Sequence, residues 1–170
     1  GPPGPGFTLS NDMIDAVENI KGVEYVNPVI TEFAAMDFAN EINLVSLVGY
    51  DTSLGDKGFV DTDIKVADGR FFSATDSKSV IIGHNVAKDL FDKKIRLKSS
   101  VNIKDVKFRV IGIFEETGID IDNRVYVPLS EARNLIGQED SVNVLVVKLL
   151  PGLDIDEIAD DMSTKLARTF

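Results

Sequence analysis

Apolar residues recur at helical spacing near both ends of the chain. Near the start, Ser10 can cap a stripe that predicts a helix over residues 11–20, ended at Gly22. Near the end, Asp154 precedes a second stripe, which predicts a helix over residues 155–168. The stripes consist of Met13, Ile14, Val17 and Ile20 in the first helix, and of Ile155, Ile158, Ala159, Met162 and Leu166 in the second.

Between these helices the pattern changes to β-type runs. The clearest signal is an antiparallel hairpin over 95–103 and 106–114 that turns at Lys104-Asp105, with a phase shift at Val110-Ile111 that predicts a bulge. Short helices are expected after Gly83 and over 130–136. The other predicted strands are 23–29, 42–50, 66–72, 80–82, 125–127 and 142–150. Hairpin strands interleaved with a few helices favour an α+β fold over a doubly wound sheet.

Composition divides the chain further. Residues 1–6 read GPPGPG, which indicates a remnant of a tag or linker. Residues 51–63 are rich in Gly, Asp, Ser and Thr and predict a loop, with a lobe boundary near it. The longest apolar runs, such as Val144–Val147, are far shorter than a bilayer span.

The charge and residue counts exclude several classes of protein. The 170 residues include 18 basic and 28 acidic side chains, one histidine and no cysteine, which gives a net charge of −10. Without cysteine there is no disulfide, thiol nucleophile or iron–sulfur cluster. The negative charge disfavours nucleic acid and anionic membrane surfaces. Absence of cysteine fits an extracytoplasmic domain, although cytosolic domains without cysteine are also common.

Two segments contain residue types that could form a chemical site. Residues 120–123 read DIDN, like the start of a calcium loop, but Arg124 stands where a ligand is needed and no glycine follows, which favours a solvated acidic loop. His84 follows a predicted strand and a glycine without an evident nucleophile, which favours a first-turn residue. We therefore expect no catalytic, cofactor-binding or metal-binding residues.

The pair Phe71-Phe72 has two interpretations. Adjacent residues on a strand point to opposite faces, so one ring could be exposed and anchor a partner. The alternative places both rings in the core, one in each layer, and this is the interpretation we favour.

Six short elements, in this order, resemble the extracytoplasmic domain of MacB/FtsX-type ABC transporter permeases. Together they extend over nearly all of residues 7–168. Where the family often has a glycine before the first hairpin strand, this chain has Lys93-Lys94. The elements are Gly22–Pro28 (GVEYVNP), Val48–Asp51 (VGYD), Asp68–Ser73 (DGRFFS), Ser79–Phe91 (SVIIGHNVAKDLF), Phe108–Phe114 (FRVIGIF) and Val125–Ala132 (VYVPLSEA).

The resemblance implies a specific organisation. A membrane-proximal, porter-like α/β lobe would be formed by residues 7–50 and 125–170, with an inserted, mostly antiparallel β lobe of sabre type at 51–124. Such a domain lies on the extracytoplasmic side of the cell membrane and has no catalytic residues and no cofactor. It couples ATP-driven conformational change to substrate export or partner regulation.

The resemblance also implies partners. These are the permease's own transmembrane helices, a second permease copy, and a separate ATP-binding subunit or domain across the membrane. A periplasmic or extracellular protein is a further candidate, and nucleic acid is not expected. If both terminal helices continue into the membrane, they should lie close together.

Two alternatives remain at this point. One is a free-standing secreted binding or adhesion domain. The other is a hydrolase that uses His84 with the acidic loop near Asp120. The first would lack neighbouring membrane helices in its gene, and the second would show activity on esters or phosphoesters.

Overall fold

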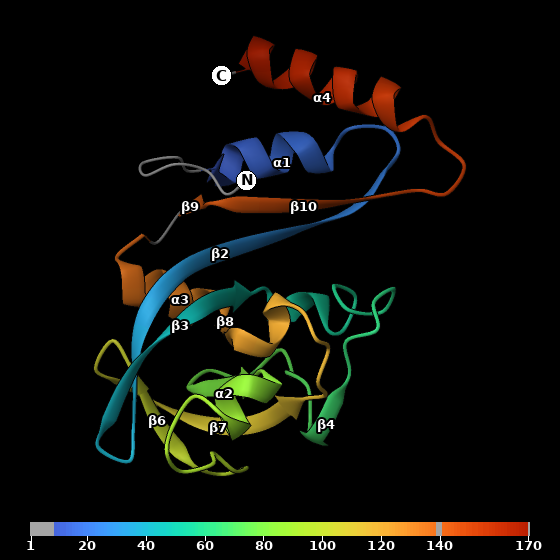
Figure 1. Cartoon of the computed structure of the whole chain (residues 1–170). Helices are drawn as coiled ribbons and strands as arrows, with labels where there is room; N and C mark the ends of the chain where they lie inside the picture. The colour runs from blue at the N-terminus through green and yellow to red at the C-terminus, as the bar shows by residue number, and fades with distance from the viewer. Residues whose placement is uncertain (1–8, 139–140, 170) are drawn as a thin grey trace. The chain divides into compact units, whose positions relative to one another are not determined.

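The computed structural model describes residues 9–138 and 141–169, which form a mixed α/β structure (Figure 1). The predicted α+β class is confirmed, while the predicted tag remnant at residues 1–6 lies outside the described residues. The helices are α1 (Asn11–Glu18), α2 (His84–Lys88), α3 (Leu129–Ile136) and α4 (Ile155–Thr169), with 3-10 turns η1 (Thr52–Leu54) and η2 (Asp120–Asn123). The strands are β1 (Leu9–Ser10), β2 (Val23–Phe38), β3 (Glu41–Tyr50), β4 (Val66–Gly69), β5 (Ser79–Ile82), β6 (Ser100–Ile103), β7 (Val106–Phe114), β8 (Arg124–Pro128), β9 (Ser141–Val142) and β10 (Val144–Leu149).

The chain forms two compact units. The terminal unit comprises residues 1–29 and 138–170, and the central unit comprises residues 30–137. The predicted lobe boundaries, at 50/51 and 124/125, lie at other positions than the boundaries of these two units. The lobe division stays a prediction. One fact favours it: β3 and β8 pair in parallel and place Tyr50 opposite Pro128, so the chain leaves and returns at neighbouring strands.

The terminal unit joins both ends of the chain. β10 pairs antiparallel with residues 23–29 of β2, and β1 pairs with β9. α1 and α4 contact each other, and the start of α1 and the end of α4 lie at the same end of this unit in Figure 1. The predicted proximity of these two helices is therefore confirmed.

The caps of α1 and α4 follow the predicted chemistry. The Ser10 side chain accepts a hydrogen bond from the Met13 amide at 3.3 Å. Asp154 Oδ1 accepts from the Asp156 amide at 2.9 Å. Gly22 has φ +97°, and a Cβ there would lie 2.8 Å from a methyl carbon of Leu153. Position 22, in the turn after α1, therefore favours glycine mainly for its positive φ, since the Leu153 methyl group could move aside.

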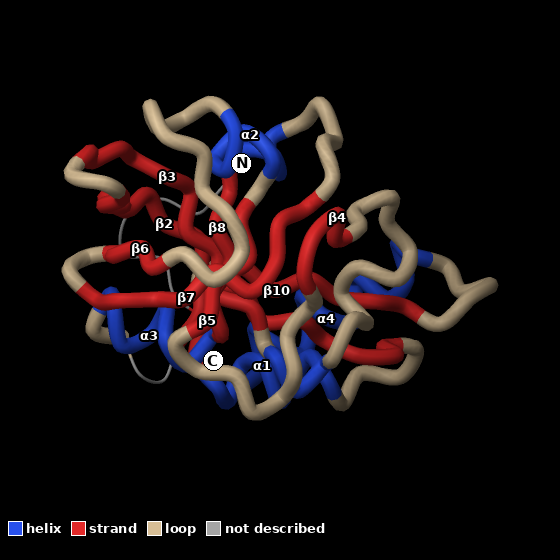
Figure 2. Tube along the Cα trace, turned by 90° about the horizontal axis from the view of Figure 1, so that it is seen from below, coloured by secondary structure: helices blue, strands red, loops and turns tan. Residues whose placement is uncertain are grey.

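The strands of the central unit pair in a closed ring. The order β2–β3–β8–β5–β7 closes because β6 pairs with both β7 and β2, and β4 extends the sheet from β7. The pairs β3–β8 and β5–β7 are parallel. Figure 2 looks at these strands from below. A ring of this kind removes most of the exposed strand edges.

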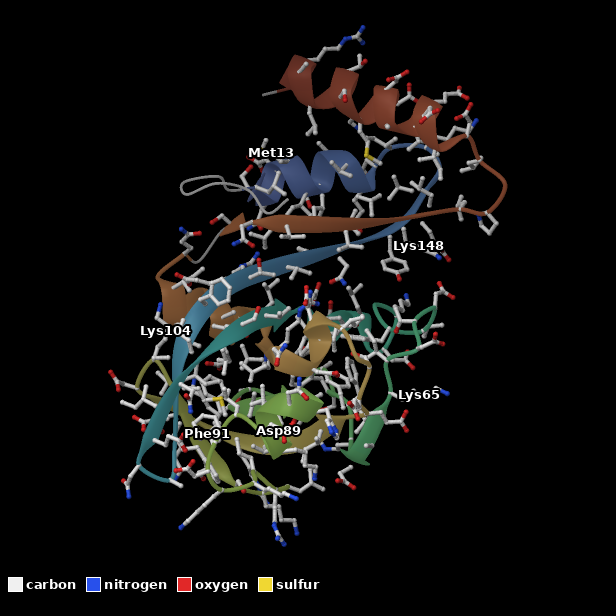
Figure 3. The ribbon with its side chains drawn as sticks, in the orientation of Figure 1. Met13, Lys65, Asp89, Phe91, Lys104 and Lys148 are labelled. Carbon is white, nitrogen blue, oxygen red and sulfur yellow. The ribbon has the colours of Figure 1, made fainter. Side chains whose placement is uncertain are left out.

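The core of the central unit lies inside this ring. Most of its side chains come from the strands, including consecutive positions of β5 and β8, and burial of each large apolar side chain contributes roughly 1.5–3 kcal/mol. The Phe91 ring, at the end of the α2 segment, packs edge-on against Phe38 with centroids 5.8 Å apart (Figure 3). Among the described residues of the central unit, those with no accessible surface are Met36, Leu47, Val80, Ile81, Ile82, Ile95, Ile103, Val125, Val127 and Ala132.

The predicted hairpin and bulge are confirmed in part. β6 and β7 pair antiparallel around Lys104-Asp105, whose φ angles of 48° and 66° form a tight turn. Val80 faces Val110 and Ile81 faces Gly112, so Ile111 is the extra residue of the bulge. The prediction of a strand over 95–99 was wrong, since Lys98 has φ +69° and breaks the extended backbone.

Three other boundaries differ from those predicted. β2 continues to Phe38 instead of ending at residue 29, because β3 and β6 supply hydrogen-bonding partners for the extension. β4 ends at Gly69, where φ is +80°. The predicted strand over 142–150 divides into β9 and β10, which pair with different strands.

Candidate functional site

His84 and the acidic loop over 115–123 are adjacent in the central unit, as α2 contacts η2. A Cβ on Gly83 would lie 2.4 Å from the carbonyl oxygen of Ile121, so only glycine allows the loop to approach this closely. His84 Nε2 lies 3.6 Å from Glu116 Oε2. In the part of the chain that the structure describes, no hydrogen bond joins His84 to a hydroxyl group. The geometry gives His84 a carboxylate neighbour and no nucleophile.

Asp122 holds this loop together. Its Oδ1 accepts hydrogen bonds from the Thr117 amide (2.8 Å) and hydroxyl (2.9 Å), and its Oδ2 accepts from the Gly118 amide (2.8 Å). Burial raises the pKa of Asp122, but the hydrogen bonds and the charge of His84 outweigh it, and the pKa is lowered overall. Among residues 9–138 and 141–169 no group of three His, Asp or Glu side chains could hold a metal ion.

Replacing Asp122 by asparagine is expected to destabilise the chain by about 1–2 kcal/mol at pH 7, because an amide group would face the Gly118 N–H. A carboxylate with a lowered pKa stabilises the fold above the unfolded pKa, about 3.9, and this contribution is lost as the pH falls through the folded value. The difference between the two proteins should therefore shrink as the pH falls below about 3.9. Urea denaturation at several pH values measures it, and a constant difference would contradict the assignment.

The segment over 68–73 is joined to Asp76 by hydrogen bonds and forms a turn. Arg70 Nη1 and Nη2 donate to Asp76 Oδ2 and Oδ1 at 2.8 and 2.9 Å. The Ser73 amide donates to Asp76 Oδ2 at 2.8 Å. The hydrogen bonds from Arg70, ahead of those from Ser73, lower the pKa of Asp76 to about 2. This motif fixes the turn that leads into β5.

Replacing Asp76 by asparagine is expected to cost about 1 kcal/mol at pH 7, because the Arg70 side chain is 54% exposed and solvent screens the pair. The pKa falls from 3.8 to about 2, so the stabilisation is complete above pH 4 and is lost as the pH falls toward 2. Thermal unfolding at pH 7 and pH 2 measures this. An undiminished difference at pH 2 would show that the effect arises elsewhere.

Phe71 and Phe72 both belong to an aromatic cluster. Neither lies on a strand, since β4 ends before them, so the expectation of opposite strand faces was wrong. Phe72 is buried and Phe71 is half-buried, and the Tyr50 ring contacts both at 5.4 and 6.4 Å. The core interpretation is confirmed in part: both rings pack in the interior, but in one shared cluster, 5.5 Å apart, and not one in each layer. The cluster consists of Tyr50, Phe59, Phe71, Phe72, Phe114 and Tyr126.

One surface feature escaped the sequence interpretation. Three large apolar side chains, Phe33 on β2 and Ile42 and Leu44 on β3, are exposed on the outside of the hairpin that these strands form. Alternation in each strand predicts two faces. It does not predict which face a neighbouring element covers; α3, for example, packs against β3 at Gly49.

The fold is that of an α/β domain. Its segments 68–73, 79–91 and 115–123 form hydrogen-bonded turns and pack aromatic rings, which is a structural role. Residues 1–165 match the family described as MacB-like periplasmic core domain. The chain therefore belongs to this family of ABC transporter permease domains, which lie on the extracytoplasmic side of the membrane.

Two relatives agree with this assignment, and one solved structure has a similar fold. An ABC transporter permease of Methanocaldococcus jannaschii is 28% identical over 98% of this chain and 42% of its own length. The macrolide export ATP-binding/permease protein MacB of Bdellovibrio bacteriovorus is 31% identical over 55% of this chain and 16% of its own length. The extracellular domain of the ABC-type transporter YknZ from Gram-positive bacteria has a TM-score of 0.73 and 24% identity, and the match covers 97% of this chain and 83% of that one.

The chain spans less than half the length of these two full-length relatives. None of the helices in the described part of the chain is both long and apolar enough to cross a bilayer.

Proposed function

We propose that this chain is a non-catalytic coupling domain, which passes ATP-driven conformational change in a permease to substrate export or to a partner protein. The observation that carries this proposal is β2, a single strand that belongs to both compact units. Its first part pairs with β10 in the terminal unit, and Met36 and Asp37 pair with β6 in the central unit. A hydrogen-bonded strand resists stretching but can bend, so a movement of one unit can reorient the other.

Other observations support the proposal. One relative is named as both ATP-binding and permease, which supports an ATP-binding partner for this chain. α1 and α4, at the two ends of the chain, lie side by side, as expected if both ends connect to the membrane. Membrane helices, a second permease copy and an ATP-binding subunit are the partners that this function requires. The family match does not favour a free-standing adhesion domain.

These 170 residues contain no cysteine, so labels can be directed to introduced cysteines in this domain once any cysteine in the rest of the transporter has been replaced. In the complete transporter with its ATPase, spin labels at Asp161→Cys in the terminal unit and Lys94→Cys in the central unit report the distance between the units. We expect this distance to change when ATP is added. A label pair at Lys65→Cys and Lys94→Cys, both exposed in the central unit, is the matched control and should not change.

Two outcomes would contradict the coupling proposal. One is an unchanged distance between Asp161→Cys and Lys94→Cys while ATP is hydrolysed. The other is the same change with a hydrolysis-deficient, nucleotide-free ATPase, since the motion would then not depend on ATP.

A further inference from the structure

A basic groove crosses the outer surface of the central unit. It has a volume of about 450 Å³ and is open to solvent. Four of its six lining residues are cationic, although the chain as a whole carries a net charge of −10. The lining residues are Lys78, Lys98, Ser100, Lys107, Phe108 and Arg109.

Strand pairing brings these cations together. Lys107 and Arg109 are exposed on one face of β7, and Phe108 between them is buried in the core. β6 places Ser100 opposite Arg109. Backbone hydrogen bonds place Lys98 beside Val110 and Lys78 beside Arg109, on opposite sides of β7. Three separate segments thus contribute positive charge to one surface.

Most of this charge is not neutralised within the chain. Lys78 forms an ion pair with Glu131 of α3. Lys98, Lys107 and Arg109 form no ion pair with any residue that the structure describes, and no acidic side chain lines the groove. Like charges at this spacing repel each other, so an anion that binds there gains from all of them.

We propose that the basic groove binds a short acidic segment of a partner protein in an extended conformation. Lys107 and Arg109 stand two residues apart on a strand, about 6.5–7 Å, which matches alternate side chains of an extended peptide. Salt screens charges over roughly 8–10 Å, so a short acidic segment in the groove interacts mainly with the cations next to it. A membrane or another large polyanion would also experience the repulsion of the net negative charge.

The test uses this chain alone, so its outcome does not depend on the coupling function. The probe is a fluorescein-labelled peptide of alternating glutamate and serine, measured by fluorescence anisotropy, with a glutamine–serine peptide as the neutral control. We expect the double variant Lys107→Glu/Arg109→Glu to weaken binding of the glutamate peptide at least about tenfold. The matched control Lys93→Glu/Lys94→Glu changes the net charge equally, outside the groove, and should weaken it less than about threefold.

Several results would overturn this inference. Equal weakening by both double variants would mean that only net charge acts. Equal binding of the neutral peptide, competition by millimolar inorganic phosphate at constant ionic strength, or tighter binding to phosphatidylglycerol vesicles would assign the groove to another ligand. Self-association of the chain that the groove variant abolishes would assign it to a second copy. Circular dichroism checks that each variant folds. If Lys107→Glu/Arg109→Glu does not fold, Lys107→Gln/Arg109→Gln is measured in its place.

Discussion

Replacing Phe114 by alanine is expected to lower the free energy of unfolding by about 3–5 kcal/mol, the largest effect of any substitution considered for this chain. The Phe114 side chain is 1% exposed, at the end of β7. Its ring lies 5.3 Å from that of Tyr126, edge to face, and 5.7 Å from that of Phe59. Alanine would leave a cavity and remove both ring contacts.

Urea denaturation followed by circular dichroism measures the effect of Phe114→Ala. Phe33→Ala is the matched control, because the Phe33 ring is 75% exposed on β2 and its removal should change stability by about 0.5 kcal/mol or less. Similar losses for the two variants would show that the aromatic cluster does not form the core of the central unit.

Gly83→Ala is expected to cost about 2–3 kcal/mol through overpacking. The new Cβ would lie 2.4 Å from the Ile121 carbonyl oxygen and 2.5 Å from that of Asp122. Both atoms belong to the backbone, so the loop has to move. The Gly83 amide also donates to the Arg124 carbonyl at 2.8 Å, which ties the same turn to β8.

Gly118→Ala is the comparison variant, because it separates the cost of a steric contact from the cost of an unfavourable backbone conformation. Gly118 has φ +75° with open space around it, so alanine there costs only the left-handed conformation, about 1 kcal/mol. Gly83 has φ −70°, so alanine there costs only the contact. Thermal unfolding compares the two. A loss at Gly83 no larger than that at Gly118 would contradict the close approach of the loop.

Local patterns predicted those elements whose causes are local. The caps at Ser10 and Asp154 lie within one helical turn of the amides that they bind. The turn at Lys104-Asp105 and the bulge at Ile111 follow from alternation and its phase shift. These features depend on residues close in the chain, and the sequence displays them directly.

Features that depend on distant residues were missed. The extension of β2 to Phe38 requires β3 and β6 as hydrogen-bonding partners. The Phe71 and Phe72 rings contact the Tyr50 ring, which belongs to β3, about twenty residues earlier in the chain. Lys78, Lys98 and Arg109 are separated in sequence and become neighbours only through strand pairing.

The sequence by itself determined the α+β class, the terminal helices and the family resemblance, since periodicity and short motifs are properties of consecutive residues. Only the tertiary structure decided that the strands of the central unit close into a ring and that cations from three segments share one groove. The physical reason is that contacts between distant segments are selected by the packing of the whole core. No stretch of consecutive residues contains that information.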